Sequence, residues 1–323
     1  MTVFALVEVV MIILGIVLAN HFEKQKELED IKEDALVLFK GVLNDLEIDI
    51  VASERIAQRN VSHNKTSDIL MDPNSDDEDN QLNSQNLQML LGYYSNFIIH
   101  NKAFLGLRQI HEDLPEEWAE VYKELELFMD NAINIDIYNK RYQKTIYATF
   151  DQHVATYPWY VRDNYVNRMS LEFVEWSKSD LCKSQTMLVL NDIGNLNYEV
   201  MNFRFEAIRL HDLIVSTLGL EVKEPKHKHV LHPEPGLLKA YTGTYRLSDP
   251  TIDASEKAQT WVIFDENDLL YAKRQKGDTL LLKNCAKAIY QLADGRADLF
   301  HFDDDELRIV KFGIEKDWIF RKE

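Results

Sequence analysis

The chain has 323 residues, enough for two domains of ordinary size and a connecting segment. Apolar residues make up 46% and aromatic residues 11% of the chain, which excludes extensive disorder. The 54 acidic residues outnumber the 36 basic ones and give a net charge of −18, which argues against nucleic acid as a partner. Two cysteines are too few for a disulfide-rich scaffold.

The first twenty residues form a strongly apolar segment. Residues 2–20 read TVFALVEVVMIILGIVLAN. A helix of this length spans about 28 Å, close to the hydrocarbon thickness of a bilayer. A buried helix of a water-soluble domain would normally carry a polar stripe, which this segment lacks. The sequence therefore predicts a transmembrane helix over residues 1–20 that contacts the lipid bilayer through residues 2–20.

Two alternatives for this segment stay open. It could be a cleaved secretory signal with Val17-Leu18-Ala19 as the small-residue cleavage site, although no Lys or Arg precedes the apolar run. It could also be a helix buried inside a water-soluble domain.

Three residues of the segment have specific consequences. An ionised Glu8 inside a bilayer would cost a few kcal/mol, so we expect its carboxyl to be neutral, paired or near the headgroups. Gly15 and Ala19 form a small-x-x-x-small pair, which lets two helices approach closely. This face predicts helix association and a possible homodimer.

Residues 21–222 predict a helical bundle. From Glu23 onward, apolar residues recur every three or four positions between charges, the pattern of a long amphipathic helix. Helical patterns resume at Leu87 and continue with breaks to about Leu220, and they predict an antiparallel bundle with two long helices. Between them, residues 61–86 contain few apolar side chains and an acidic cluster, and are predicted to be a surface loop.

Residues 223–236 are rich in proline and predict a stiff linker. The linker also holds His227, His229 and His232, which are weak candidates for zinc or copper ligands. The alternative is a polar linker without fixed geometry, and on that interpretation we expect no metal and no cofactor.

After the linker the hydrophobic period changes from helical to alternating, which predicts strands over residues 237–323. The expected strands are Ala240–Arg246, Thr260–Phe264, Leu269–Lys273, Thr279–Leu282, Ala288–Leu292, Asp298–Phe302, Leu307–Phe312 and Trp318–Arg321. Short turns between them favour an antiparallel meander, and closure into a small barrel would remove its exposed edges. The predicted fold class is therefore segregated α+β: an N-terminal membrane helix, an antiparallel helical bundle and a C-terminal small antiparallel β-barrel.

No catalytic pattern is complete. Ser62-x-x-Lys65 and Tyr94-Ser95-Asn96 match two motifs of the penicillin-recognising serine hydrolases, but the third motif, Lys-Thr-Gly, is missing. The zinc-protease, phosphate-loop and hydrolase-elbow motifs are also missing from the sequence. We therefore predict no catalytic residue and a protein that is not an enzyme.

Two segments resemble known families. Glu8–Ala19, followed by a charged helix that includes Leu43-Asn44-Asp45-Leu46, resembles a family of uncharacterised bacterial single-pass membrane proteins. This resemblance implies a topology and no activity. Leu238–Tyr245, with Asp268–Tyr271 and Phe300–Phe302, is similar to the lipocalin-like barrels appended to serine beta-lactamase-type proteins, which are accessory and not catalytic.

Together, these observations predict a non-catalytic interaction or scaffold protein of the bacterial envelope. The resemblances imply an inner-membrane anchor with the soluble domains on the periplasmic side, whereas Lys24, Lys26 and Lys32 after the span favour the opposite side. The expected partners are the bilayer, a second copy of the chain and an unidentified protein. The alternative function is binding of a small apolar ligand by the C-terminal barrel.

Overall fold

The computed structural model describes residues 2–71, 86–166, 170–220, 235–248, 260–274, 279–292, 298–310 and 318–323. For residues 2–10, 12, 69–71, 162, 164–166 and 235 it describes the backbone alone. The chain forms two compact units: Met1–Ile48, His100–Leu127 and Arg209–Lys223 make the first, and Asp49–Ile99, Phe128–Ile208 and Glu224–Glu323 make the second.

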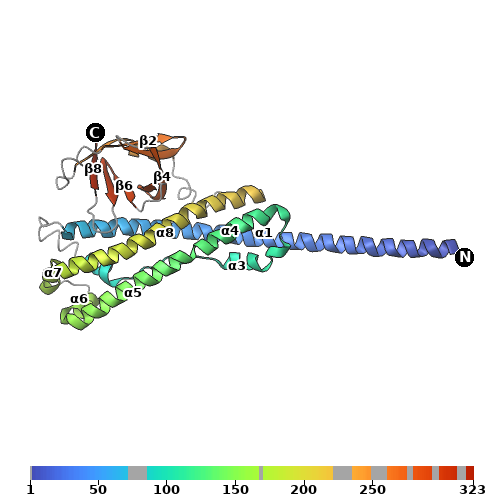
Figure 1. Ribbon diagram of the computed structural model, residues 1–323, viewed down its shortest axis with the longest axis horizontal. Coiled ribbons are helices and arrows are strands. Elements are labelled where there is room, and N and C mark those ends of the chain that lie inside the picture. The colour runs from blue at the N-terminus through green and yellow to red at the C-terminus, as the bar shows by residue number, and fades with distance from the viewer. Residues whose placement is uncertain are drawn as a thin grey trace. The chain divides into compact units, whose positions relative to one another are not determined.

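The described elements are helical up to residue 241 and strands after it (Figure 1). The helices are α1 (Thr2–Met71), α3 (Lys102–Gln109), the 3₁₀ helix η1 (His111–Asp113), α4 (Glu116–Asn131), α5 (Ile133–Thr156), α6 (Pro158–Val166), α7 (Leu171–Ser177), α8 (Asp180–Leu218) and α10 (Pro235–Tyr241). Residues 86–92 are also helical. The strands are β1 (Gly243–Leu247), β2 (Thr260–Glu266), β3 (Leu269–Arg274), β4 (Thr279–Ala286), β5 (Ile289–Leu292), β6 (Leu299–Asp303), β7 (Glu306–Val310) and β8 (Trp318–Lys322).

The predicted long first helix is present as α1, and it is longer than expected. Residues 61–71, predicted as part of a surface loop, are helical instead. Local bonds satisfy the polar side chains of this stretch: the Asn64 amide donates to the Asn60 carbonyl at 3.0 Å, and the Thr66 hydroxyl donates to the Ser62 carbonyl at 3.1 Å. Since these polar residues find partners within the helix, they do not end it. The acidic part of the predicted loop, residues 72–85, lies outside the described residues.

The transmembrane helix predicted over residues 1–20 is not supported. Within the described part of the chain, no helix has an apolar stretch long enough to cross a membrane. The side chains of residues 1–10 and 12, which include Glu8, lie outside the description. The remaining apolar side chains up to Phe22 are exposed.

The first unit is built on close contact between α1 and α3. A Cβ atom added at Gly41 would lie 2.8 Å from the Ala103 Cβ, and one added at Gly106 would lie 2.7 Å from a Leu38 methyl carbon. Gly41 therefore lets the helices approach more closely than a larger residue would permit, whereas at Gly106 the Leu38 side chain can shift to make room. Within the unit, Phe39 of α1 packs edge-on against Trp118 of α4, with ring centroids 5.8 Å apart.

In the second unit, α5 and α8 lie side by side and antiparallel (Figure 1). Asp192 of α8 accepts a hydrogen bond from Thr145 and pairs with Arg141, both on α5. Further along, the ring of His153 on α5 meets the Gln185 amide oxygen on α8 at 2.7 Å. Residue numbers rise along α5 while those of its partners fall along α8, which is the arrangement predicted for the bundle.

The eight predicted strands are all present and form a closed antiparallel barrel in simple chain order. Closure comes from the pairing of β1 with β8, where Arg246 lies opposite Arg321. The predicted first strand begins too early, because Ala240 and Tyr241 belong to α10 and the strand starts at Gly243. Asn267 and Asp268, in the predicted turn between β2 and β3, both have positive φ, as a tight hairpin requires.

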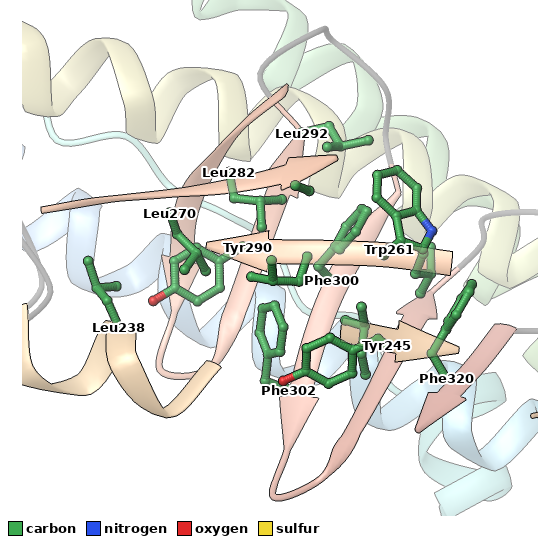
Figure 2. Packing of buried hydrophobic residues seen from close by; sticks show 14 of the residues in the cluster. Leu238, Tyr245, Trp261, Leu270, Leu282, Tyr290, Leu292, Phe300, Phe302 and Phe320 are labelled. Atoms are coloured by element: carbon green, nitrogen blue, oxygen red, sulfur yellow. The ribbon is translucent and has the colours of Figure 1, made fainter. Parts of the chain in front are cut away.

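The barrel interior is filled by its own side chains. Figure 2 shows Tyr245, Tyr290 and Phe302 inside it, and the rings of both tyrosines pack edge-on with that of Phe302. Leu238 of α10 is buried in the same cluster, and Tyr241 of α10 stacks on Phe302 with ring centroids 4.9 Å apart. The short helix therefore packs into the barrel core instead of continuing the linker.

Candidate functional site

Polar contacts hold the barrel against α1 and α8 within the second unit. The guanidinium of Arg204 on α8 is fully buried and donates from Nη1 to the Ile50 carbonyl at 2.6 Å and from Nε to the Asn284 carbonyl at 3.2 Å. The register of the β4–β5 pair shifts between Asn284 and Ala286, and this bulge bends the strand where Arg204 binds. One side chain thus joins α1, α8 and the barrel.

An ion pair ties the barrel to α1 closer to the end of that helix. Arg308 of β7 lies 2.9 Å from the Asp68 carboxylate, and both side chains are largely buried. Near this pair, His301 of β6 has its pKa lowered to about 4 by burial and by the positive charges of Lys65 and Arg308. These contacts fix the barrel in place, and we assign them a structural role.

A groove lies elsewhere in the second unit, between α5 and the extended segment of residues 93–100. Its volume is about 340 Å³. The lining residues are Tyr94, Asn96, Phe97, Ile98, Ile99, Ile135, Asp136, Asn139, Lys140 and Gln143. A groove of this size is at the lower end of the range for ligand sites and can accept a few side chains of a partner.

Asn139 fixes the extended segment to α5. Its buried side chain accepts a hydrogen bond from the Phe97 N–H at 3.1 Å and donates one to the Phe97 carbonyl at 2.7 Å. The amide thus reproduces both bonds that a neighbouring strand would make to one residue. Tyr142 adds a bond from its hydroxyl to the Tyr93 carbonyl at 3.2 Å.

The side chains of the segment alternate as in a strand. Phe97 is buried and its ring packs edge-on against Phe203 of α8, with centroids 5.4 Å apart. Asn96 and Ile98 on either side are exposed, Ile98 by 62%. Their backbone N–H and C=O groups make no hydrogen bond to any residue that the structure describes. The segment therefore presents an open strand edge beside a groove lined by both apolar and polar side chains.

The two charged residues that line the groove, Asp136 and Lys140, form an exposed ion pair with each other. The residues of the first serine-hydrolase motif lie elsewhere: Ser62 is exposed on α1, and Lys65 lies 3.5 Å from Asp303 of the barrel. Tyr94 and Asn96 line the groove instead.

The other candidate residues from the sequence remain apart from these features. Gly15 has open space around it and Ala19 is exposed, so helix association through them stays a prediction. His227, His229 and His232 lie outside the described residues, and no cluster of potential metal ligands occurs among the residues that are described.

The two cysteines are buried, and neither forms a disulfide. Burial raises the pKa of both thiols, Cys182 and Cys285, to about 12. A thiol in this state is a poor nucleophile, because the reactive form is the thiolate.

Sequence reasoning missed the extended segment, which it placed within a helical region. The run of aromatic and β-branched residues in Tyr93-Tyr94-Ser95-Asn96-Phe97-Ile98-Ile99 was a signal for extended backbone. The sequence holds no comparable signal for the roles of Asn139 and Arg204, because each side chain hydrogen-bonds backbone atoms that are distant in the chain.

Comparison with protein-family models, curated proteins and solved structures gives no match. The two resemblances noted in the sequence therefore stay predictions, as do the bilayer contact and the envelope location. We therefore infer the function from the geometry of the second unit.

Proposed function

We propose that this protein is a non-catalytic interaction protein that binds an extended segment of a partner protein along residues 94–99. The observation that carries the proposal is the open strand edge beside the groove. Added strands are recognised through main-chain hydrogen bonds, which give affinity, and through pockets for alternate side chains, which give specificity. The open backbone groups of Asn96 and Ile98 provide the first of these elements, and the groove provides the second.

The chemistry of the groove defines the partner segment. Ile98 and Ile135 line it with apolar surface, and the charges of Asp136 and Lys140 balance each other. We therefore expect an extended peptide with apolar residues at alternate positions and no strong preference for net charge.

The alternative function, binding of a small apolar ligand inside the barrel, has less support. Fifteen buried apolar side chains, including Trp261, Phe300 and Phe320, pack together in the interior. An eight-stranded barrel is only just wide enough for its own side chains to fill it, or to hold one small ligand.

A selection of random peptides displayed on phage against the full chain tests the proposal. We expect enriched peptides to bind the wild type and to lose at least about tenfold in affinity to Ile98→Lys, because a charge would then replace apolar surface of the groove. Leu188→Lys is the matched control, since Leu188 is a half-exposed apolar residue of α8 in the same unit. Equal binding by both variants, or peptides that bind the barrel, would contradict the proposal.

A further inference from the structure

A second, smaller cavity lies behind the extended segment. It has a volume of about 10 Å³, room for about one water-sized atom. The lining residues are Ile56, Arg59, Asn60, His63, Ser95, Tyr142, Ile193 and Leu196. The first four recur at three- and four-residue steps and so lie on one face of α1.

Hydrogen-bond donors dominate the polar lining of this cavity. The Asn60 side chain is 1% exposed, and its Nδ2 atom has no partner among the described residues, although its Oδ1 accepts from Asn64. A buried amide donor without an acceptor is strongly unfavourable, so an acceptor is expected inside the cavity. The Ser95 hydroxyl and the His63 ring can donate as well.

The electrostatic environment is positive. Arg59 lies at the cavity, and no carboxylate is among the lining residues. Burial and the Arg59 charge lower the pKa of His63 to about 4, which places the guanidinium near this ring and keeps the ring neutral at pH 7. Tyr142 uses its hydroxyl proton for the Tyr93 carbonyl, so its oxygen can only accept.

From this lining we propose that the cavity between Asn60, Arg59 and Ser95 binds a small monatomic anion, with chloride as the physiological candidate. The ion accepts from Asn60 Nδ2, from the Ser95 hydroxyl and from the Arg59 guanidinium. Because Ser95 belongs to the extended segment, the ion fixes this segment from behind while Asn139 fixes it at Phe97. The inference is independent of the partner proposed for the groove on the other side.

The probe is bromide, which replaces chloride and scatters X-rays anomalously. In crystals of the full chain soaked in sodium bromide, we expect an anomalous peak within hydrogen-bonding distance of Asn60 Nδ2. A water molecule at this position without an anomalous signal would overturn the proposal, as would bromide bound only outside the cavity.

A solution measurement gives the affinity. The unfolding temperature is followed as chloride replaces gluconate at constant ionic strength. We expect a saturable increase, with the half-saturating chloride concentration at least about tenfold higher in Arg59→Gln, because hydrogen bonds between ionised partners are about twice as strong as neutral ones. Arg55→Gln is the matched control, since Arg55 is also exposed on α1 and does not line the cavity. Equal chloride responses in the two variants would contradict the site, whereas peptide binding at Ile98 would be unaffected by that outcome.

Discussion

The Nη1 atom of Arg204 on α8 lies 2.6 Å from the Ile50 carbonyl oxygen on α1. The same nitrogen is 3.2 Å from the Ser53 hydroxyl, and Nε reaches the Asn284 carbonyl of β4. A charged group without exposed surface is retained only where its donors are satisfied, as they are here. One side chain therefore contacts the barrel and both helices at once.

Replacement of this side chain should be strongly destabilising. Arg204→Ala leaves a cavity and removes the buried donor to the Ile50, Ser53 and Asn284 oxygens, and we expect the free energy of unfolding to fall by about 3 kcal/mol. Urea denaturation measures the loss. Arg209→Ala, on the same helix, removes an exposed ion pair with Glu124 and should cost less than about 1 kcal/mol. A similar loss in both variants would contradict the role assigned to Arg204.

The ion pair of Arg308 and Asp68 predicts an energetic coupling between barrel and helix. A double-mutant cycle with Arg308→Met and Asp68→Asn should give a coupling free energy of about 1–2 kcal/mol, because both side chains are largely shielded from solvent. A coupling of zero in urea denaturation would mean that the barrel does not dock on α1 through this pair.

Two glycines of α1 should respond in opposite ways to alanine. Gly→Ala inside a helix normally stabilises by about 0.5–1 kcal/mol. At Gly41 the new methyl would meet Ala103, so we expect Gly41→Ala to destabilise by about 1–3 kcal/mol. Gly15 has no atom within 4 Å, and Gly15→Ala should be neutral or stabilising. The unfolding temperatures of the two variants test this expectation. Stabilisation by Gly41→Ala would contradict the α1–α3 contact.

Stability should fall as the solution becomes acidic. The pKa values of His63 and His301 are lowered to about 4 by burial and nearby positive charge. The unfolded chain takes up protons at these residues near pH 6.5 and the folded chain only near pH 4, so stability is lost as the pH falls between these values. Urea denaturation across this range should show a shallower pH dependence in a His63→Gln, His301→Gln variant. An unchanged slope would be inconsistent with neutral, buried imidazoles.

The barrel could be predicted from the sequence because its signals are local. Alternating apolar residues and turn residues such as Asn267 and Asp268 specify each hairpin, and sequential hairpins leave few alternatives to a meander. The long helices were predictable for the same reason, from their apolar period.

The candidate site could not be predicted because it depends on contacts between distant residues. The groove requires Asn139 to bind the backbone of Phe97, 42 positions earlier in the chain. The end of α1 was mispredicted because its polar residues, such as Asn64, bond within the helix and pack in the second unit, which composition does not reveal. Polarity alone indicated a loop there.

The proposed partner adds an extended segment along residues 94–99. Hydrogen–deuterium exchange of the full chain, with and without a saturating selected peptide, tests it most directly. We expect slower exchange of the Asn96 and Ile98 amides in the complex, with the strands of the barrel unchanged. Protection of the barrel strands with unchanged exchange at Asn96 and Ile98 would contradict it.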